Sequence, residues 1–156
     1  LRWHRKAADQ GNADAQCNLG CMYEHGRGIQ QDYAEAARWY RKAAEQGHVT
    51  AQFNLGCMYD NGQGVQQDHT EAARWYRKAG EQGHADAQYN LGVMYANGEG
   101  VQKDDAKAVR WYRKAAEQGH VNAQFNLGTM HYNGHGVQQD FADAARWWRK
   151  AAGAAS

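Results

Sequence analysis

Histidine offers the most versatile chemistry in this sequence, because its side chain can ligate a metal or act as a base. His131 and His135 are spaced i, i+4, which suits two zinc ligands on one helix, but no third ligand accompanies them. Three further histidines, His48, His84 and His120, lie 36 residues apart at one place in a repeated unit. Units that pack at about 10 Å would hold them too far apart to share one ion. We therefore expect neither a metal site nor a cofactor.

Cysteine chemistry is not indicated either. The three cysteines, Cys17, Cys21 and Cys57, are an odd number without CxxC spacing, which argues against a disulfide framework and a zinc site. Their redox state is not fixed by the sequence. The repeated Gly-x-Gly segments lack the preceding strand and the third glycine of a dinucleotide-binding turn. No Ser/His/Asp or Cys/His arrangement stands out, so the sequence predicts no catalytic residues and no enzyme.

The basic residues form a regular pattern. Fifteen of the 18 lysines and arginines belong to five copies of an Arg-x-x-Arg-Lys trio, from Arg2, Arg5 and Lys6 to Arg146, Arg149 and Lys150. Such a row could follow a nucleic-acid backbone. However, Glu35 precedes Arg38 by three residues and Glu45 follows Arg41 by four, which are favourable helix-surface pairings, and the formal net charge is only +1. We expect a solvated outer face and no nucleic acid, and we keep nucleic-acid binding, with its steep salt dependence, as the alternative.

One asparagine recurs in every unit, and we call these four residues the asparagine row: Asn18, Asn54, Asn90 and Asn126. Asparagine has a low helix propensity, so its repetition inside a predicted helix requires an explanation. Its amide both donates and accepts hydrogen bonds, and it could bind the backbone of an extended peptide. Alternatively, each asparagine bonds the backbone of a neighbouring unit and supports the fold. The sequence leaves both interpretations open.

Two positions on the same predicted helix vary from unit to unit. The first holds Cys21, Cys57, Val93 and Thr129, and the second holds Glu24, Asp60, Ala96 and Tyr132. We call them the first and second variable rows. Different side chains at a fixed geometry are typical of a binding surface. With the asparagine row, they are the predicted ligand-binding residues, on the concave surface that stacked first helices form in a solenoid.

Two further rows have structural interpretations. At the start of the same helix stand residues that form good caps or suit the helix dipole: Asp14, Thr50, Asp86 and Asn122. Opposite the main apolar face stand mostly aromatic residues: Cys17, Phe53, Tyr89 and Phe125. We expect this row to pack between successive first helices, and an exposed aromatic strip for a ligand is the less favoured alternative.

These residues are positioned by an internal repeat. The tryptophans recur every 36 residues without an insertion, at Trp3, Trp39, Trp75, Trp111 and Trp147. Leucines and paired loop glycines keep the same step. We predict a single repeat domain over residues 1–156, with a partial second helix over 1–11 and full helix pairs over about 12–47, 48–83, 84–119 and 120–153.

Each unit is predicted to contain two helices. In the first unit, apolar residues follow the 3.6-residue helical period over about 13–25 and again over about 32–46. Asp32 is a predicted N-cap, with Glu35 three residues later in a capping-box-like arrangement. Gly20 would let a neighbouring helix approach closely, and Gly47 stands where a left-handed C-terminal cap is expected.

Composition excludes other classes of protein. Hydrophobic residues make up 42% and charged residues 22% of the chain, which is too apolar for disorder and too polar for a membrane protein. No apolar run approaches the roughly 20 residues that span a bilayer, so no membrane insertion is expected, and we predict a soluble monomer. The sequence begins at Leu1 inside a helical pattern, and both the compartment and an export signal upstream of Leu1 stay open.

The repeated motif is specific. The string A-Q-[FY]-N-L-G-x-M-Y-x-N-G-x-G-V, followed by W-Y-R-K-A-A-E-Q-G, resembles the Sel-1-like repeat family, a relative of the tetratricopeptide repeats. The resemblance covers essentially the whole chain. It implies an all-α fold, a right-handed α/α superhelical solenoid of 36-residue helix-turn-helix repeats. Related tetratricopeptide grooves use an asparagine at the place that matches the asparagine row.

The chain departs from the family pattern at two points. The family often has proline after the loop valine, where this sequence has glutamine: Gln30, Gln66, Gln102 and Gln138. This difference should loosen the start of each second helix slightly. A cysteine-rich branch of the family staples each helix pair with a disulfide and is linked to β-lactam binding, but its paired cysteines are missing here, so that activity is not implied.

The family resemblance also implies a function. Its members act as adaptors that bind other proteins. The expected function is therefore a scaffold or adaptor that binds a protein or peptide on the concave surface of the first helices, with the partner unknown.

Overall fold

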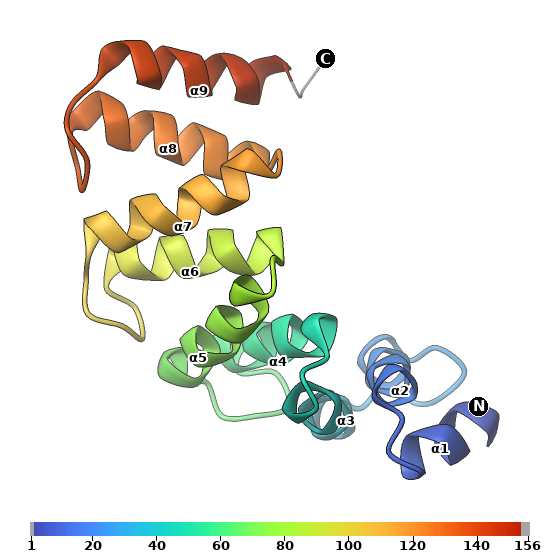
Figure 1. Cartoon of the computed structure of the whole chain (residues 1–156). Coiled ribbons are helices and arrows are strands. Elements are labelled where there is room, and N and C mark those ends of the chain that lie inside the picture. Colours follow the sequence, from blue (N-terminus) through green and yellow to red (C-terminus); the bar gives the residue numbers. More distant parts are fainter. Residues whose placement is uncertain (1, 154–156) are drawn as a thin grey trace. The chain divides into compact units, whose positions relative to one another are not determined.

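A computed structural model describes residues 2–153, and over that range it contains helices joined by turns and no strand (Figure 1). The helices are α1 (Arg2–Asp9), α2 (Ala13–His25), α3 (Tyr33–Glu45), α4 (Val49–Asn61), α5 (His69–Glu81), α6 (Ala85–Asn97), α7 (Asp105–Glu117), α8 (Val121–Asn133) and α9 (Phe141–Gly153). The predicted pairs of helices in 36-residue repeats are confirmed. The first helices are α2, α4, α6 and α8, and the second helices are α1, α3, α5, α7 and α9.

The chain divides into two compact units, residues 1–79 and 80–156, with the boundary inside α5. In the first unit α1 packs on α2, α2 on α3, and α3 on α4. In the second unit α6 packs on α7, α7 on α8, and α8 on α9. Each helix therefore buries its apolar face against its neighbours in the chain, as the nearest-neighbour organisation of a solenoid requires.

Inside each helix pair, a glycine of the first helix lies directly against an aromatic ring of the second. A Cβ atom added to Gly20 of α2 would lie 2.7 Å from the Tyr40 ring of α3, and one added to Gly56 of α4 would lie 2.7 Å from the Tyr76 ring. Real Cβ atoms do not approach so closely. The prediction that the glycine allows close helix packing is confirmed, and the ring that fills the space is fully buried in Tyr40.

The second helices begin as predicted, with one difference. The Asp32 carboxylate accepts a hydrogen bond of 3.0 Å from the Glu35 backbone N–H. In a full capping box the Glu35 side chain would return to the Asp32 N–H. Here that N–H donates to the Tyr23 carbonyl, and the Glu35 carboxylate pairs with Arg38 at 3.1 Å. The capping box is therefore only half formed, because the Tyr23 carbonyl of α2 already accepts from the Asp32 N–H.

The first helices begin with different caps from those predicted. The N-cap residues are Asn12, His48, His84 and His120, and in each the side chain accepts a hydrogen bond from the backbone N–H three residues later. Of the two roles predicted for the residues at positions 14, 50, 86 and 122, capping or matching the helix dipole, capping is wrong. Asp14 and Asp86 do lie in the first turn, where a carboxylate suits the helix dipole.

A buried glutamine in each first helix ties the repeats together, and sequence analysis did not identify it. These residues are Gln16, Gln52, Gln88 and Gln124, each at most 6% exposed. The Gln16 amide donates to the Ala8 carbonyl of α1 at 3.1 Å and accepts from Gln46, beyond the end of α3, at 2.8 Å. One side chain thus links three helices by hydrogen bonds in a dry interior, where an unpaired amide would be costly.

In two of the long loops, the second glycine packs against the preceding repeat. A Cβ atom on Gly64 would lie 2.1 Å from the backbone carbonyl oxygen of Tyr33, at the start of α3. In the second unit, a Cβ atom on Gly136 would similarly lie 2.3 Å from the backbone of Asp105, at the start of α7. These loops are therefore part of the contact between successive repeats.

Candidate ligand-binding surface of the first helices

The three predicted binding rows are accessible on the first helices of the first unit. On α2, Asn18 is exposed, and Cys21 and Glu24 are half-buried. On α4, all three residues of these rows, Asn54, Cys57 and Asp60, are half-buried. The intervening core position is closed to solvent, because Leu19 and Leu55 are both 0% exposed.

The same rows are accessible in the second unit. On α6, Asn90, Val93 and Ala96 are half-buried, and on α8, Asn126 and Thr129 are half-buried and Tyr132 is 48% exposed. None of the twelve predicted residues is buried. The rows therefore lie at the edge of each helix pair, where the side chains are at most partly covered and stay open to solvent.

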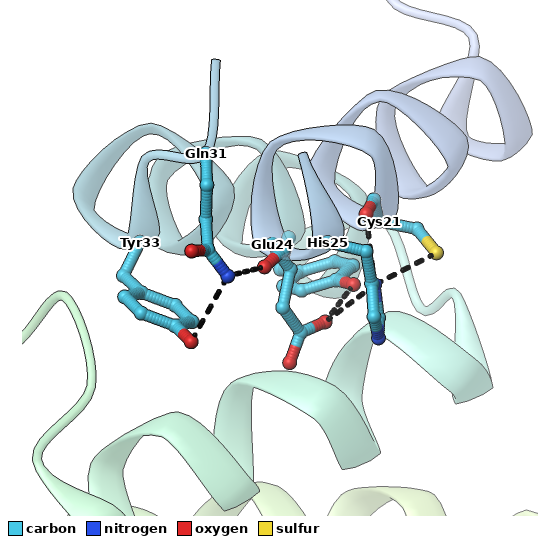
Figure 2. Close-up of polar contacts among 6 residues, drawn as sticks. Cys21, Glu24, His25, Gln31 and Tyr33 are labelled. Carbon is cyan, nitrogen blue, oxygen red and sulfur yellow. Dashed lines mark hydrogen bonds and ion pairs between the residues drawn. The ribbon is translucent and has the colours of Figure 1, made fainter. Parts of the chain in front are cut away.

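A polar cluster surrounds Glu24 at the end of α2 (Figure 2). The Tyr40 hydroxyl donates a short hydrogen bond of 2.6 Å to Glu24 Oε2. Burial and this contact with Glu24 raise the pKa of Tyr40 far above its ordinary value. The Gln31 amide donates to the Glu24 carbonyl at 2.7 Å and to the Tyr33 hydroxyl at 3.1 Å. The Tyr40 hydroxyl thus holds the Glu24 carboxylate at the edge of the helix pair, and Gln31 ties the loop to the Glu24 backbone.

Cys21 and His25 lie side by side in the same cluster but do not form a catalytic pair (Figure 2). His25 Nδ1 lies 3.0 Å from the Cys21 carbonyl oxygen and 3.6 Å from its sulfur. Because a carbonyl only accepts, Nδ1 must carry the proton, so this nitrogen cannot remove a proton from the thiol. Burial raises the pKa of the neighbouring Cys17 thiol to about 11, with smaller contributions from Cys21 and Asp14. Cys17 is therefore a protonated core residue at neutral pH.

The second helix pair has an acidic cluster at the equivalent place. Asp60 Oδ1 lies 2.8 Å from Nδ1 of His69, the first residue of α5. The Tyr76 hydroxyl lies 3.4 Å from Asp60 Oδ2 and 3.5 Å from the Cys57 sulfur. His69 stands at the place of Tyr33, so an imidazole contacts the carboxylate here. Gln67 repeats the contact of Gln31 by donating to the Asp60 carbonyl at 2.7 Å.

The fourth helix pair replaces this polar cluster with stacked aromatic rings. The Tyr132 ring lies 5.1 Å from the Phe141 ring and 5.5 Å from the Trp148 ring, measured between centroids. Phe141 is 59% exposed, so the stack faces solvent. Tyr132, Phe141 and Trp148 occupy the places of Glu24, Tyr33 and Tyr40 in the first pair. The second variable row therefore changes from carboxylate to aromatic on the same backbone geometry.

One member of the asparagine row has a structural contact. The Asn126 side chain of α8 acts on the Tyr112 phenol of α7, in the preceding repeat, and lowers its pKa. Burial acts more strongly in the opposite direction and raises the Tyr112 pKa to about 12 overall. At Asn126, this effect favours the interpretation that the asparagine row supports the fold.

The aromatic residues of the row at positions 17, 53, 89 and 125 contact the second helix of their own pair, and Tyr89 also makes the predicted contact with the next first helix. Phe53 contacts Tyr76 at 5.8 Å, and Tyr89 contacts Tyr112 at 5.9 Å, so each ring lies against the second helix of its own pair. Tyr89 also stacks on His120 at 4.6 Å, at the start of the next first helix. Phe125 is 56% exposed, the most accessible ring of this row.

The basic trios cover the tryptophans of the second helices. The Lys42 ammonium lies 4.5 Å from the centre of the Trp39 ring, and the Arg38 guanidinium lies 5.9 Å from it. Such cation–π contacts are repeated at Trp75, Trp111 and Trp147. Arg41 donates to the Tyr59 hydroxyl of the next repeat, in place of the predicted pairing with Glu45. The trios thus have a role in the fold, and nothing in their arrangement favours nucleic acid.

The fold separates His131 and His135, the two histidines considered as zinc ligands. His131 is 4% exposed in the core of α8, whereas His135 lies exposed in the following loop. Among residues 2–153, no group of three or more histidine, cysteine or acidic side chains is placed to hold a metal ion.

Comparison with known protein families accounts for the repeat. The model of the Sel1 repeat matches residues 1–12, 13–48, 49–84, 85–120 and 121–155. The chain belongs to the Sel1 repeat family. Sel1 repeat proteins are generally scaffolds for protein interactions. The comparison with curated proteins found no match.

Solved Sel1 structures have the same fold. A protective antigen of uropathogenic Escherichia coli, described as having an SLR fold, is 42% identical with a TM-score of 0.95, over 99% of this chain and 33% of that one. A Sel1 repeat protein from Oxalobacter formigenes is 41% identical with a TM-score of 0.89, over 92% of this chain and 59% of that one. This chain therefore spans only part of the length of these two relatives.

A more distant structure has a different cysteine content. The cysteine rich protein B of Helicobacter pylori is 28% identical with a TM-score of 0.63, over 81% of this chain and 90% of that one. In the Sel1 chain described here, Cys17, Cys21 and Cys57 are free thiols. Among the described residues, no helix is long and apolar enough to cross a lipid bilayer.

Proposed function

We propose that this Sel1 repeat chain is a scaffold that binds an extended segment of another protein on the asparagine row and the two variable rows of a compact unit. The observation that carries the proposal is chemical variation on a constant geometry. The rows stay accessible in every repeat, while the core beside them stays closed. Within the second variable row, the side chain is an anchored carboxylate at Glu24 and part of an aromatic stack at Tyr132.

A ligand on these rows would meet amides, carboxylates and aromatic side chains. Accessible amides can exchange hydrogen bonds with water for hydrogen bonds with a peptide backbone at little cost to folding. Carboxylates held in place by Tyr40 and by His69 lose little conformational freedom when a donor binds them. Aromatic side chains supply much of the binding energy at protein interfaces. A polypeptide segment, which offers backbone groups and varied side chains together, matches all three.

A peptide-display selection tests the proposal. Random peptides would be selected on the intact chain, and the affinity of the selected peptides would be measured for Asn54→Ala and Asp60→Ala. We expect each substitution to weaken binding about 5-fold or more, the loss of about one net hydrogen bond. Arg74→Ala is the matched control, because this exposed side chain lies on the outer face of the same unit.

The binding measurements distinguish a ligand on the predicted rows from a ligand on the outer face. Unchanged binding by Asn54→Ala and Asp60→Ala, together with weakened binding by Arg74→Ala, would place the ligand on the outer face and contradict the proposal. Thermal melts of the same variants show whether a loss of binding reflects a loss of folding.

A further inference from the structure

The histidines that cap the first helices have an unusual set of partners. His48 Nδ1 accepts a hydrogen bond of 3.2 Å from the Ala51 N–H and so caps α4. The other ring nitrogen, Nε2, lies 3.1 Å from Asp14 Oδ1, on the first turn of α2 in the preceding repeat. His120 repeats this arrangement at 3.1 Å to the Ala123 N–H and 3.1 Å to Asp86 of α6. Each ring therefore connects the starts of two successive first helices.

These contacts fix the protonation state of the ring. An acceptor at Nδ1 requires a lone pair, so the neutral ring must carry its proton on Nε2. That Nε2–H then points at the carboxylate and donates to it. Both contacts are made by the neutral Nε2–H tautomer and by no other form of the ring. The side chains of His48 and His120 are only 20% and 14% exposed, so solvent does not easily replace either contact.

We propose that the capping histidines make the stacking of successive Sel1 repeats sensitive to acid, because a proton added at Nδ1 abolishes the helix cap. The added proton would face the Ala51 or Ala123 N–H, and two donors cannot share a hydrogen bond. The positive ring would also stand at a helix N-terminus, where the helix dipole disfavours cations. Loss of an N-cap destabilises a helix, and here the same ring also joins two repeats.

The charges around the rings do not compensate for this loss. Among the described residues, the titratable groups in contact with these rings are Asp14 for His48, and Asp86 with the stacked Tyr89 for His120. The two carboxylates would attract a charged ring. However, the Asp14 and Asp86 side chains are 85% and 63% exposed, and an ion pair with so exposed a partner contributes little.

His84, the third capping histidine, gives independent support. It caps α6 by accepting from the Ala87 N–H at 3.2 Å. Burial lowers the pKa of His84 below its ordinary value, against a smaller opposing effect of Asp86. Because the unfolded chain then takes up the proton first, stability falls as the pH drops through about 6.5 towards the folded-state pKa, and it is retained above that window.

The N-cap of α2 suggests a control variant that does not titrate. The first helix α2 is capped by Asn12, whose side-chain oxygen accepts from the Ala15 N–H at 2.9 Å. Asparagine caps as histidine does but does not titrate. The triple variant His48→Asn, His84→Asn, His120→Asn should therefore fold at neutral pH and lose acid sensitivity. The converse variant, Asn12→His, adds one titrating cap to α2.

The experiment compares thermal melts at about pH 8 and about pH 5.5, on either side of the ordinary histidine pKa. We expect the Tm of the parent to fall more on acidification than that of the triple variant, and the Tm of Asn12→His to fall more than that of the parent. Equal losses in all three proteins would overturn the proposal. None of these measurements uses a ligand, so the result is independent of the function proposed above.

A second measurement needs no variant. Nitrogen-15 NMR correlations of the imidazole rings at about pH 8 distinguish the two neutral tautomers. His48 and His120 should carry the proton on Nε2. A proton on Nδ1 of both rings at that pH would exclude the cap and overturn the proposal, whatever the thermal melts show.

Discussion

At the scale of single residues, the repeat lets each position be compared with its own copies. Position 131 holds histidine where three other repeats have tyrosine, and buried His131 leaves its Nδ1 without a partner in the described structure. Position 124 is similar, because Gln124 Oε1 lacks the donor that Gln46 gives to Gln16. A buried polar group without a partner destabilises the fold. The fourth repeat thus departs from the others in the core as well as on the surface.

The same comparison separates the two interpretations of the asparagine row. Asn18 is exposed, whereas Asn126 is half-buried and acts on the Tyr112 phenol, whose pKa it lowers. We expect Asn126→Ala to lower the free energy of unfolding by about 1 kcal/mol, since the phenol loses a partner. Asn18→Ala should leave it unchanged or raise it by up to about 0.7 kcal/mol, because alanine has the higher helix propensity. Urea titrations of both variants measure the difference.

The signs of the two changes in unfolding free energy show whether the asparagine row supports the fold. Destabilisation of similar size at both positions would make the whole row a structural support, and the predicted ligand surface would then consist of the two variable rows alone. Stabilisation at both would show that the contact with Tyr112 contributes nothing to folding.

At the scale of helices and loops, most boundaries could be predicted from the sequence. The period of apolar residues gave about 13–25 for a helix that spans Ala13–His25, because each unit repeats the same pattern with a glycine at each end. The caps at His48, His84 and His120 were missed, since histidine is not among the preferred N-cap residues. The buried glutamines were missed for a similar reason, because glutamine is usually exposed. Only their exact repetition next to a core alanine signalled a role.

The surface residues were predicted less completely for a physical reason. Periodicity showed which positions lie outside the core, and the twelve predicted residues are accessible. The partners of Glu24, Asp60 and Tyr132 come from the loop and from the second helix, at sequence distances that a helical pattern does not encode. The chemistry of the edge of each helix pair therefore emerged only from the fold.

A prediction about loops isolates the contact between repeats. Gly28 and Gly64 occupy equivalent places with φ of 71° and 70°, so alanine suffers the same backbone strain at both. At Gly64 the new Cβ would also collide with the Tyr33 backbone, whereas at Gly28 its nearest neighbour is the Met22 methyl at 3.8 Å. We expect Gly28→Ala to cost about 1 kcal/mol of unfolding free energy. Gly64→Ala should cost clearly more, by at least another 1–2 kcal/mol.

Denaturant unfolding of the two variants measures this difference directly. Equal losses would mean that the loop moves away from Tyr33 at no cost, and that the glycine serves only the positive φ angle.

At the scale of the whole molecule, stability is distributed over contacts between neighbouring helices. The tryptophans of the second helices show how burial depends on these neighbours. Trp39 and Trp75 are 3% and 5% exposed, while Trp3, in the partial helix α1, is 81% exposed. A residue of the same type at the same place in the repeat is therefore core in one helix and surface in another. In a solenoid, a substitution should weaken the fold according to the neighbours that cover the residue.

Replacement of Trp75 and of Trp3 by alanine tests this organisation. Trp75→Ala removes a buried ring and the two cation–π contacts that Arg74 and Lys78 make with it at 5.6 Å and 4.8 Å. We expect a loss of about 3–5 kcal/mol in the free energy of unfolding, as for other buried aromatic residues. Trp3→Ala should cost about 0.5 kcal/mol or less, as for an ordinary surface position. Similar losses at the two positions in denaturant titrations would contradict the nearest-neighbour organisation, because they would show that α1 is stabilised as strongly as a helix covered by the repeats around it.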